Sequence, residues 1–111
     1  MQSRGVYVIR IAAMRSGMHP QTLRKYERVG FLTPYRSRMQ RLYSDQDILR
    51  LKMIKYLVDE VGLNLAGVEL ALNLRSKLHR MERELASLQE GNPVKRRIGK
   101  AVNEMLQMVE P

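Results

Sequence analysis

The spacing of apolar residues predicts two consecutive helices in the middle of the chain. Ser44 can cap the first helix and Gly62 can close it, and Asn64 can cap the second. The first helix buries one face, made of Ile48, Leu51, Ile54, Leu57, Val58 and Val61. The second buries Leu65, Val68, Ala71 and Leu72. The pattern therefore predicts a mainly α domain whose core is built by these two helices.

A helix, a tight turn and a second helix are predicted before this core. Residues 10–16 form two helical turns stopped by Gly17, and Pro20 suits the first position of a helix that Gly30 ends. Residues 6–9 are a β-prone run that predicts a short strand. On a helical wheel, Leu23 and Tyr26 of the second helix turn toward the core. The opposite arc carries long polar side chains: Gln21, Arg24, Lys25 and Arg28.

A hairpin with a basic tip is expected next. Residues 31–33 predict a strand before the Pro34 turn, residues 35–40 a loop, and residues 41–43 the returning strand. The loop carries Arg36 and Arg38, and Arg41 follows it. A hairpin after a helix pair has the layout of a wing, so residues 1–73 predict a winged helix-turn-helix domain.

From Leu74 the apolar spacing becomes four, three, four, three, which is a heptad seam: Leu74, Leu78, Met81, Leu85 and Leu88. We interpret residues 74–90 as a dimerisation helix; packing of that helix on its own domain is the alternative. Residues 91–93 break the helix. Residues 91–111 then form a tail in which a short amphipathic helix is expected, with Val94, Ile98, Ala101, Met105 and Met108 on one face. That face can serve as a partner-binding peptide or pack on the dimer helix.

The charge is concentrated at one end of the chain. The 111 residues carry a net charge of +9, and residues 1–43 contain nine basic residues against one acidic residue, Glu27. Such clustering favours a surface that binds a polyanion, although a solvated basic face would look the same. Glu27 lies toward the core side of its helix and is expected to pair with a neighbouring arginine.

Several classes of function find no support in the sequence. There is no cysteine, hence no disulfide or thiolate site, and no glycine-rich phosphate loop or nucleophile elbow. His19 and His79 lack a second ligand at metal spacing, so neither a metal nor a cofactor is expected, and no catalytic residue is assigned. Apolar runs of a few residues cannot span a bilayer. We expect a cytoplasmic protein that is not an enzyme and has no small-molecule effector.

The residues resemble the MerR family of bacterial transcription regulators. The resemblance covers about residues 7–75 and rests on the runs IAAMRSGM (11–18), TLRKYERVGFLTP (22–34), RLY (41–43), DILRL (47–51) and GLNLAGV (62–68). The strings GMHPQTLR and NLAGV further resemble the heat-shock repressor (HspR-like) subgroup. The resemblance implies a winged helix, a C-terminal antiparallel coiled-coil dimer, inverted-repeat DNA that is bent or untwisted, and the DnaK chaperone as a co-repressor.

The same resemblance assigns site residues one by one. Thr22, Arg24 and Tyr26 match positions of the recognition helix near DNA, and Arg41 matches the wing arginine. Lys25 and Gln40 stand where many relatives have tyrosine, so ring contacts are not expected there. With the basic face, the full expected DNA-binding set is His19, Gln21, Thr22, Arg24, Lys25, Tyr26, Arg28, Arg36, Arg38 and Arg41.

The sequence thus predicts a homodimeric repressor of heat-shock or chaperone genes that binds double-stranded DNA. Two alternatives stay open: a short MerR-type regulator of nitrogen metabolism whose tail is read by a metabolic enzyme, and an adaptor whose basic face binds an acidic protein. Selection of one inverted repeat from random DNA separates the regulators from the adaptor.

Overall fold

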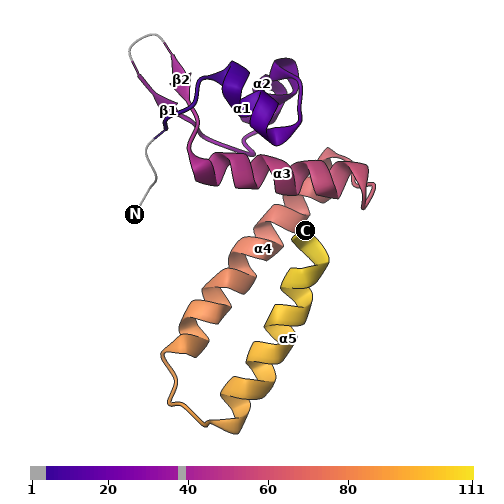
Figure 1. Ribbon diagram of the computed structural model, residues 1–111. Coiled ribbons are helices and arrows are strands. Elements are labelled where there is room, and N and C mark those ends of the chain that lie inside the picture. Colours follow the sequence, from indigo (N-terminus) through magenta and orange to yellow (C-terminus); the bar gives the residue numbers. More distant parts are fainter. Residues whose placement is uncertain (1–4, 38–39) are drawn as a thin grey trace.

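The computed structural model describes residues 5–37 and 40–111, and in them the chain is mainly helical (Figure 1). The helices and strands follow in the order α1 (Ile9–Ser16), α2 (Pro20–Arg28), β1 (Tyr35–Arg36), β2 (Arg41–Leu42), α3 (Asp45–Asp59), α4 (Leu65–Ala86) and α5 (Pro93–Val109). The first four elements lie on one side of α3, and α4 and α5 project from its other side as an antiparallel pair.

The predicted turn between the first two helices is confirmed. Gly17 ends α1 at φ 72°, in the left-handed region that glycine adopts without strain. Its N–H and that of Met18 donate to carbonyls of the last turn of α1. Pro20 opens α2, where its missing N–H would have had no partner. Local chemistry therefore sets where α1 stops and where α2 starts.

The predicted caps of the next two helices are also confirmed. Ser44 forms a capping box with Asp47: the Ser44 hydroxyl accepts from the Asp47 N–H at 3.0 Å, and the Asp47 carboxylate accepts from the Ser44 N–H at 2.9 Å. Asn64 caps α4 by accepting from the Gly67 N–H at 2.9 Å. Beyond that cap α4 runs without a break to Ala86. The helix expected to bury Leu65 to Leu72 and the dimerisation helix expected from Leu74 are therefore one element.

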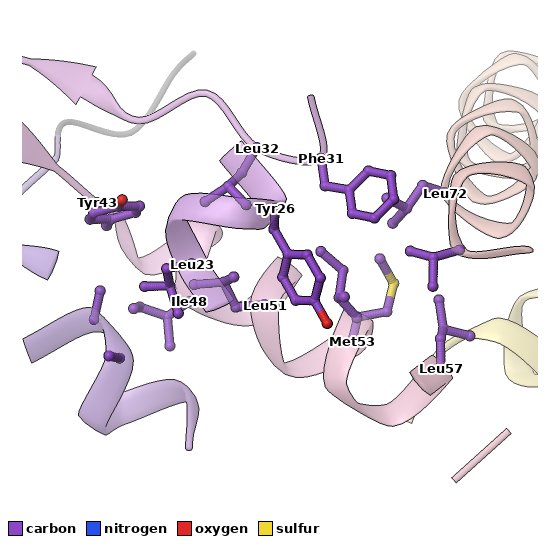
Figure 2. Packing of buried hydrophobic residues seen from close by; sticks show 14 of the residues in the cluster. Leu23, Tyr26, Phe31, Leu32, Tyr43, Ile48, Leu51, Met53, Leu57 and Leu72 are labelled. Carbon is purple, nitrogen blue, oxygen red and sulfur yellow. The ribbon is translucent and has the colours of Figure 1, made fainter. Parts of the chain in front are cut away.

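The main core lies where α1, α2 and the start of α4 meet α3 (Figure 2). Leu23 and Tyr26 reach into it from α2, and Leu51 and Leu57 from α3. Phe31 contacts Tyr26, with ring centroids 5.8 Å apart. Arg50 of α3 donates a hydrogen bond to the carbonyl of Phe31, which fixes the chain just beyond α2. The core thus holds α2 rigidly on α3.

The hairpin differs from the one expected. Residues 31–33 form no strand, because Phe31 and Leu32 are both buried and a strand would direct successive side chains to opposite faces. The strands instead begin after Pro34, and Tyr35 pairs with Leu42 and Arg36 with Arg41. Residues 6–9 likewise supply a single bridge, in which Tyr7 and Tyr43 exchange backbone hydrogen bonds, before α1 begins.

The α4–α5 pair has a small core of its own. Leu78 of α4 is buried against Val102 and Leu106 of α5, and Leu85 packs beside them. The end of α5 is tied to α4 by Glu110, which accepts from Arg75 Nε at 2.7 Å and lies 2.6 Å from His79 Nε2. Burial raises the pKa of Glu110, but the hydrogen bonds with His79 and Arg75 outweigh it and hold that pKa below its ordinary value.

A membrane-spanning helix and a metal-binding cluster are both absent from the described residues. No helix within residues 5–37 and 40–111 is long and apolar enough to cross a membrane. In the same part of the chain, no three His, Asp or Glu side chains gather in a way that could hold a metal ion.

Candidate nucleic-acid interface

Helix α2 presents a polar surface to solvent because its apolar residues are committed to the core. Leu23 is fully buried and Tyr26 is 7% exposed. The polar side chains that the helical wheel places opposite the core are exposed or half-buried: Gln21, Arg24, Lys25 and Arg28. Thr22 is half-buried. His19 lies just before the helix, and its ring nitrogen accepts from the Gln21 N–H at 3.1 Å. The ring of His19 therefore caps the N-terminus of α2.

Tyr26 was expected to contact DNA, but its side chain does not lie on the polar surface of α2. Its ring packs on Phe31 inside the core, and burial raises the pKa of its hydroxyl. The wheel already placed Tyr26 on the core side, and the resemblance alone put it near DNA. Its role in this structure is to anchor α2.

Glu27 joins α2 to the hairpin. Its carboxylate, 13% exposed, lies 2.9 Å from Arg41 Nε and 3.6 Å from Arg36 Nη2. The buried hydroxyl of Tyr43 donates to the same carboxylate at 3.3 Å. Burial, with the negative charge of Glu27 adding to it, raises the pKa of Tyr43 to about 12. The expected pairing of Glu27 with a neighbouring arginine is confirmed, and it holds both arginines next to α2.

A basic cleft lies between α2, the hairpin and the start of α1. Its volume is about 560 Å³, and it is lined by Val8, Ile9, Arg24, Arg36, Ser37, Gln40 and Arg41. We call it the arginine cleft. Three arginines line it, one each from α2, β1 and β2, and the carboxylate of Glu27 pairs with two of them, Arg36 and Arg41. Arg38, expected in the same loop, lies outside the described residues.

The start of α1 adds to the attraction for anions at the arginine cleft. Val8, the residue before the helix, has no side chain that could cap it. The Ile11 N–H donates to the Val8 carbonyl at 3.0 Å, whereas the N–H groups of Ile9 and Arg10 make no backbone hydrogen bond among the described residues. These two groups lie at the positive end of the helix dipole and can bind a ligand. An oxyanion such as a phosphate suits both the guanidinium groups and these N–H donors.

Sequence reasoning missed that Val8, Ile9 and Gln40 line this cleft. They reach it because the Tyr7–Tyr43 bridge brings the start of α1 beside the hairpin. A bridge between residues this far apart in the chain leaves no periodic signal. One sequence feature pointed to this end of α1: the apolar run at residues 6–9 leads into the helix and offers no side chain that could cap it.

The comparison with protein families decides the identity of this domain. The model of the MerR HTH family regulatory proteins matches residues 7–74, well over half of the chain. The chain belongs to the MerR family. The matched residues therefore form a DNA-binding helix-turn-helix domain of a family of regulatory proteins. The basic surface of α2 and the arginine cleft both lie inside the matched residues.

A relative in Streptomyces coelicolor, named as a heat shock protein, HspR, is 40% identical to this MerR protein over 84 residues. The match covers 75% of this chain and 56% of the relative, so the chain spans about half the length of that protein. The comparison with solved structures gave no significant match.

Proposed function

We propose that this MerR protein is a sequence-specific repressor of heat-shock or chaperone genes and binds inverted-repeat operators as a homodimer. The observation that carries the proposal is the arginine cleft beside the exposed face of α2, on a domain of the MerR family. The similarity to a protein named for heat shock supports the choice of genes.

Within this proposal α2 is the recognition helix and β1–β2 is the wing. Gln21, Lys25 and Arg28 point most directly away from the core, at about 140–200° from Leu23 on the wheel, and are placed to reach base edges in a major groove. Thr22 and the cap His19 lie at the edge of that face.

Arg24 has a different task from the other polar residues of α2. It lines the arginine cleft together with Arg36 and Arg41, where the first-turn N–H groups of α1 also lie. We assign this cleft to one backbone phosphate, and Arg24 to that phosphate in preference to a base. The cleft then fixes the position of the domain on DNA, and the outer face of α2 reads the sequence.

The homodimer is proposed to form through α4. Of the five predicted seam residues, Leu78 and Leu85 already pack on α5 within the chain. Leu74 and Met81 of α4, seven residues apart, remain 43% and 38% exposed, and Leu88, which is 41% exposed, follows just beyond the end of α4. That spacing suits an antiparallel pairing with α4 of a second copy. Two recognition helices would then read two half-sites.

We further propose the DnaK chaperone as co-repressor, so that its withdrawal during stress weakens operator occupancy. The support is the name of the relative together with the implied subgroup. Operator binding measured with and without DnaK tests this part alone. Equal affinity in both conditions would remove the co-repressor and leave the repressor.

Selection of bound duplexes from a random DNA pool tests the proposed function. A repressor of this kind enriches one inverted repeat with a fixed spacing between its halves. Enrichment of no sequence, with binding that only follows salt concentration, would instead indicate an adaptor with a basic face.

A further inference from the structure

Of the described residues that line the arginine cleft, Ser37 alone carries a hydroxyl group. It follows β1 directly, and its backbone N–H donates to the carbonyl of Gln40 at 2.9 Å, across the hairpin. Its side chain is exposed. The backbone of Ser37 is thus held at the edge of the cleft, and its hydroxyl is accessible from solvent.

The residues around Ser37 carry an excess of positive charge. Arg24 of α2, Arg36 of β1 and Arg41 of β2 line the same cleft. The carboxylate of Glu27 lies 2.9 Å from Arg41 Nε and 3.6 Å from Arg36 Nη2. Arg24 makes no ion pair among the described residues, and the side chain of Arg36 is 69% exposed. One carboxylate therefore leaves most of the cationic capacity of the cleft available.

A phosphoryl group on Ser37 would match the chemistry of this cleft. Phosphoserine carries a charge of about −1.5 to −2 near pH 7 and three oxygens that accept strong hydrogen bonds. Arginine side chains donate to such oxygens in pairs. Because the group would be bonded to the Oγ of a residue that lines the cleft, its effective concentration there would be roughly millimolar or higher. It would compete directly with a phosphate of the DNA backbone.

We propose that Ser37 is a phosphorylation site and that its phosphate fills the arginine cleft, which weakens the binding of DNA. This inference rests on the proposed function, in which the cleft binds one backbone phosphate. When Ser37 is unmodified, the arginines are available to DNA. When Ser37 is phosphorylated, the same arginines are occupied and the added negative charge repels the duplex.

The modification is a phosphoryl transfer from ATP, catalysed by a serine kinase. The Oγ of Ser37 attacks the γ-phosphorus, and a bond forms between these two atoms. The bond from that phosphorus to the oxygen that bridges to the β-phosphate breaks, and ADP leaves with the electron pair. The hydroxyl proton passes to a base of the kinase. Arg36 and Arg38, on either side of Ser37 in the sequence, give such an enzyme a charge pattern to recognise.

An alternative role for the Ser37 hydroxyl is a hydrogen bond to a DNA phosphate and nothing more. A phosphate installed on Ser37 would then still weaken DNA binding by repulsion, but the arginines of the cleft would not hold it. The state of the phosphate itself therefore has to be measured as well as the affinity for DNA.

Phosphorus NMR of the whole chain, with phosphoserine installed at position 37, tests whether the phosphate enters the cleft. The second pKa of phosphoserine is ordinarily about 6. Nearby arginines favour the dianion, so this pKa should be lower in the folded chain than in the same chain unfolded by urea. Arg24→Ala should bring the pKa of the folded chain back toward about 6. The same pKa in folded and unfolded chains would overturn the inference.

DNA titration at one salt concentration tests the consequence for binding. The chain with phosphoserine at position 37 should bind its selected inverted repeat about a hundredfold more weakly than the unmodified chain. Phosphoserine at Ser76, an exposed residue of α4, adds the same charge away from the cleft and should change the affinity by less than about threefold.

The outcomes separate the inference from the proposed function. Selection of one inverted repeat, with an affinity that phosphoserine at position 37 leaves unchanged, would overturn the inference and leave the proposed function. Selection of no DNA by the unmodified chain would overturn both the proposed function and the effect on binding. The phosphorus NMR titration uses no DNA, so it would still decide whether the phosphate enters the cleft.

Mass spectrometry of the protein purified from its own cells tests whether the modification occurs. Trypsin would cut after Arg36 and again after Arg38, so cleavage after acidic residues is used instead and gives the peptide of residues 28–45. We expect part of this peptide to carry a phosphate, located on Ser37 by fragmentation. Recovery of only the unmodified peptide, from growing and from heat-stressed cells, would contradict the site.

Discussion

At the scale of single residues, Glu27 organises the candidate site. One carboxylate accepts the Tyr43 hydroxyl and holds Arg41 and Arg36 beside α2. The carboxylate of Glu27 reduces the local positive charge. It also holds the side chains of Arg36 and Arg41 where they can contact a phosphate. A preformed site loses less conformational entropy on binding than a mobile one.

Tyr43 gives a pH-dependent prediction. Its pKa in the folded chain is about 12 against an ordinary 10.0, so the folded state keeps the proton longer than the unfolded state. The free energy of unfolding should therefore be unaffected by Tyr43 below pH 10 and fall as the pH rises from 10 toward 12, by up to about 2 kcal/mol. Urea denaturation of wild type and Tyr43→Phe across this range checks it. An equally steep loss in Tyr43→Phe would assign the effect to other groups.

Arg24 and Lys25 are neighbours for which we predict different effects on DNA binding. Arg24→Ala should weaken binding to all duplexes alike and reduce the slope of log affinity against log salt by about 1, because it removes one phosphate contact. Lys25→Ala should reduce discrimination at one base pair by about 1–3 kcal/mol. Titrations of matched and mismatched duplexes at several salt concentrations measure both. Arg96→Ala, which removes the same charge from α5, is the control, and a base-specific loss in Arg24→Ala would contradict the cleft assignment.

At the scale of elements, the helix boundaries were predictable because their causes are local. Gly17, Pro20, Ser44 and Asn64 act on backbone groups within a few residues of themselves. The strands were displaced from their expected positions because burial of both Phe31 and Leu32 overrides their β propensity. The arginine cleft could not be foreseen, since it depends on the long-range bridge between Tyr7 and Tyr43.

Helix α5 shows a further limit of pattern reading. The sequence singled out the stripe from Val94 to Met108, but the structure buries the neighbouring Val102 and Leu106 and leaves most of that stripe exposed. A short helix with two adjacent apolar stripes gives no internal sign of which one faces its own chain. That choice depends on the shape of α4.

The capping box of α3 supports the core beneath α2. Ser44→Ala removes the hydroxyl that accepts from the Asp47 N–H and leaves that buried end of the helix unsatisfied. We expect a loss of about 1 kcal/mol in the free energy of unfolding, measured by urea denaturation. Ser76→Ala, an exposed change within α4, should have no comparable effect. Equal losses in the two variants would mean that the cap contributes nothing specific.

A substitution at Leu106 tests whether the α4–α5 pair unfolds independently of α1 to α3. Leu106→Ala empties part of its small core and should cost about 2–4 kcal/mol there. Amide hydrogen exchange should then speed up in α5 and the second half of α4, while α1 to α3 keep their protection. If hydrogen exchange became faster to the same extent in all the helices, α1 to α3 would unfold together with the α4–α5 pair as one unit.

At the scale of the whole molecule, the two proposed functions, DNA binding and dimerisation, belong to opposite ends. The chain measures 51 × 31 × 20 Å along its principal axes. The basic region formed by α1, α2 and the hairpin lies at one end, and the α4–α5 pair extends from α3 toward the other (Figure 1). A single copy of the DNA-binding region would cover one half-site, so the proposed specificity needs the second copy with which α4 is proposed to pair. The distance between the two recognition helices then fixes the spacing of half-sites.

The most direct test is the affinity of the wild-type protein for its selected inverted repeat, for the repeat with one half scrambled, and for a fully scrambled duplex. All three titrations use the same salt concentration, near 0.15 M. The account predicts binding to the intact repeat at least about a thousandfold tighter than to the scrambled duplex, with most of that gain lost when one half is scrambled. Equal affinity for all three duplexes would contradict it.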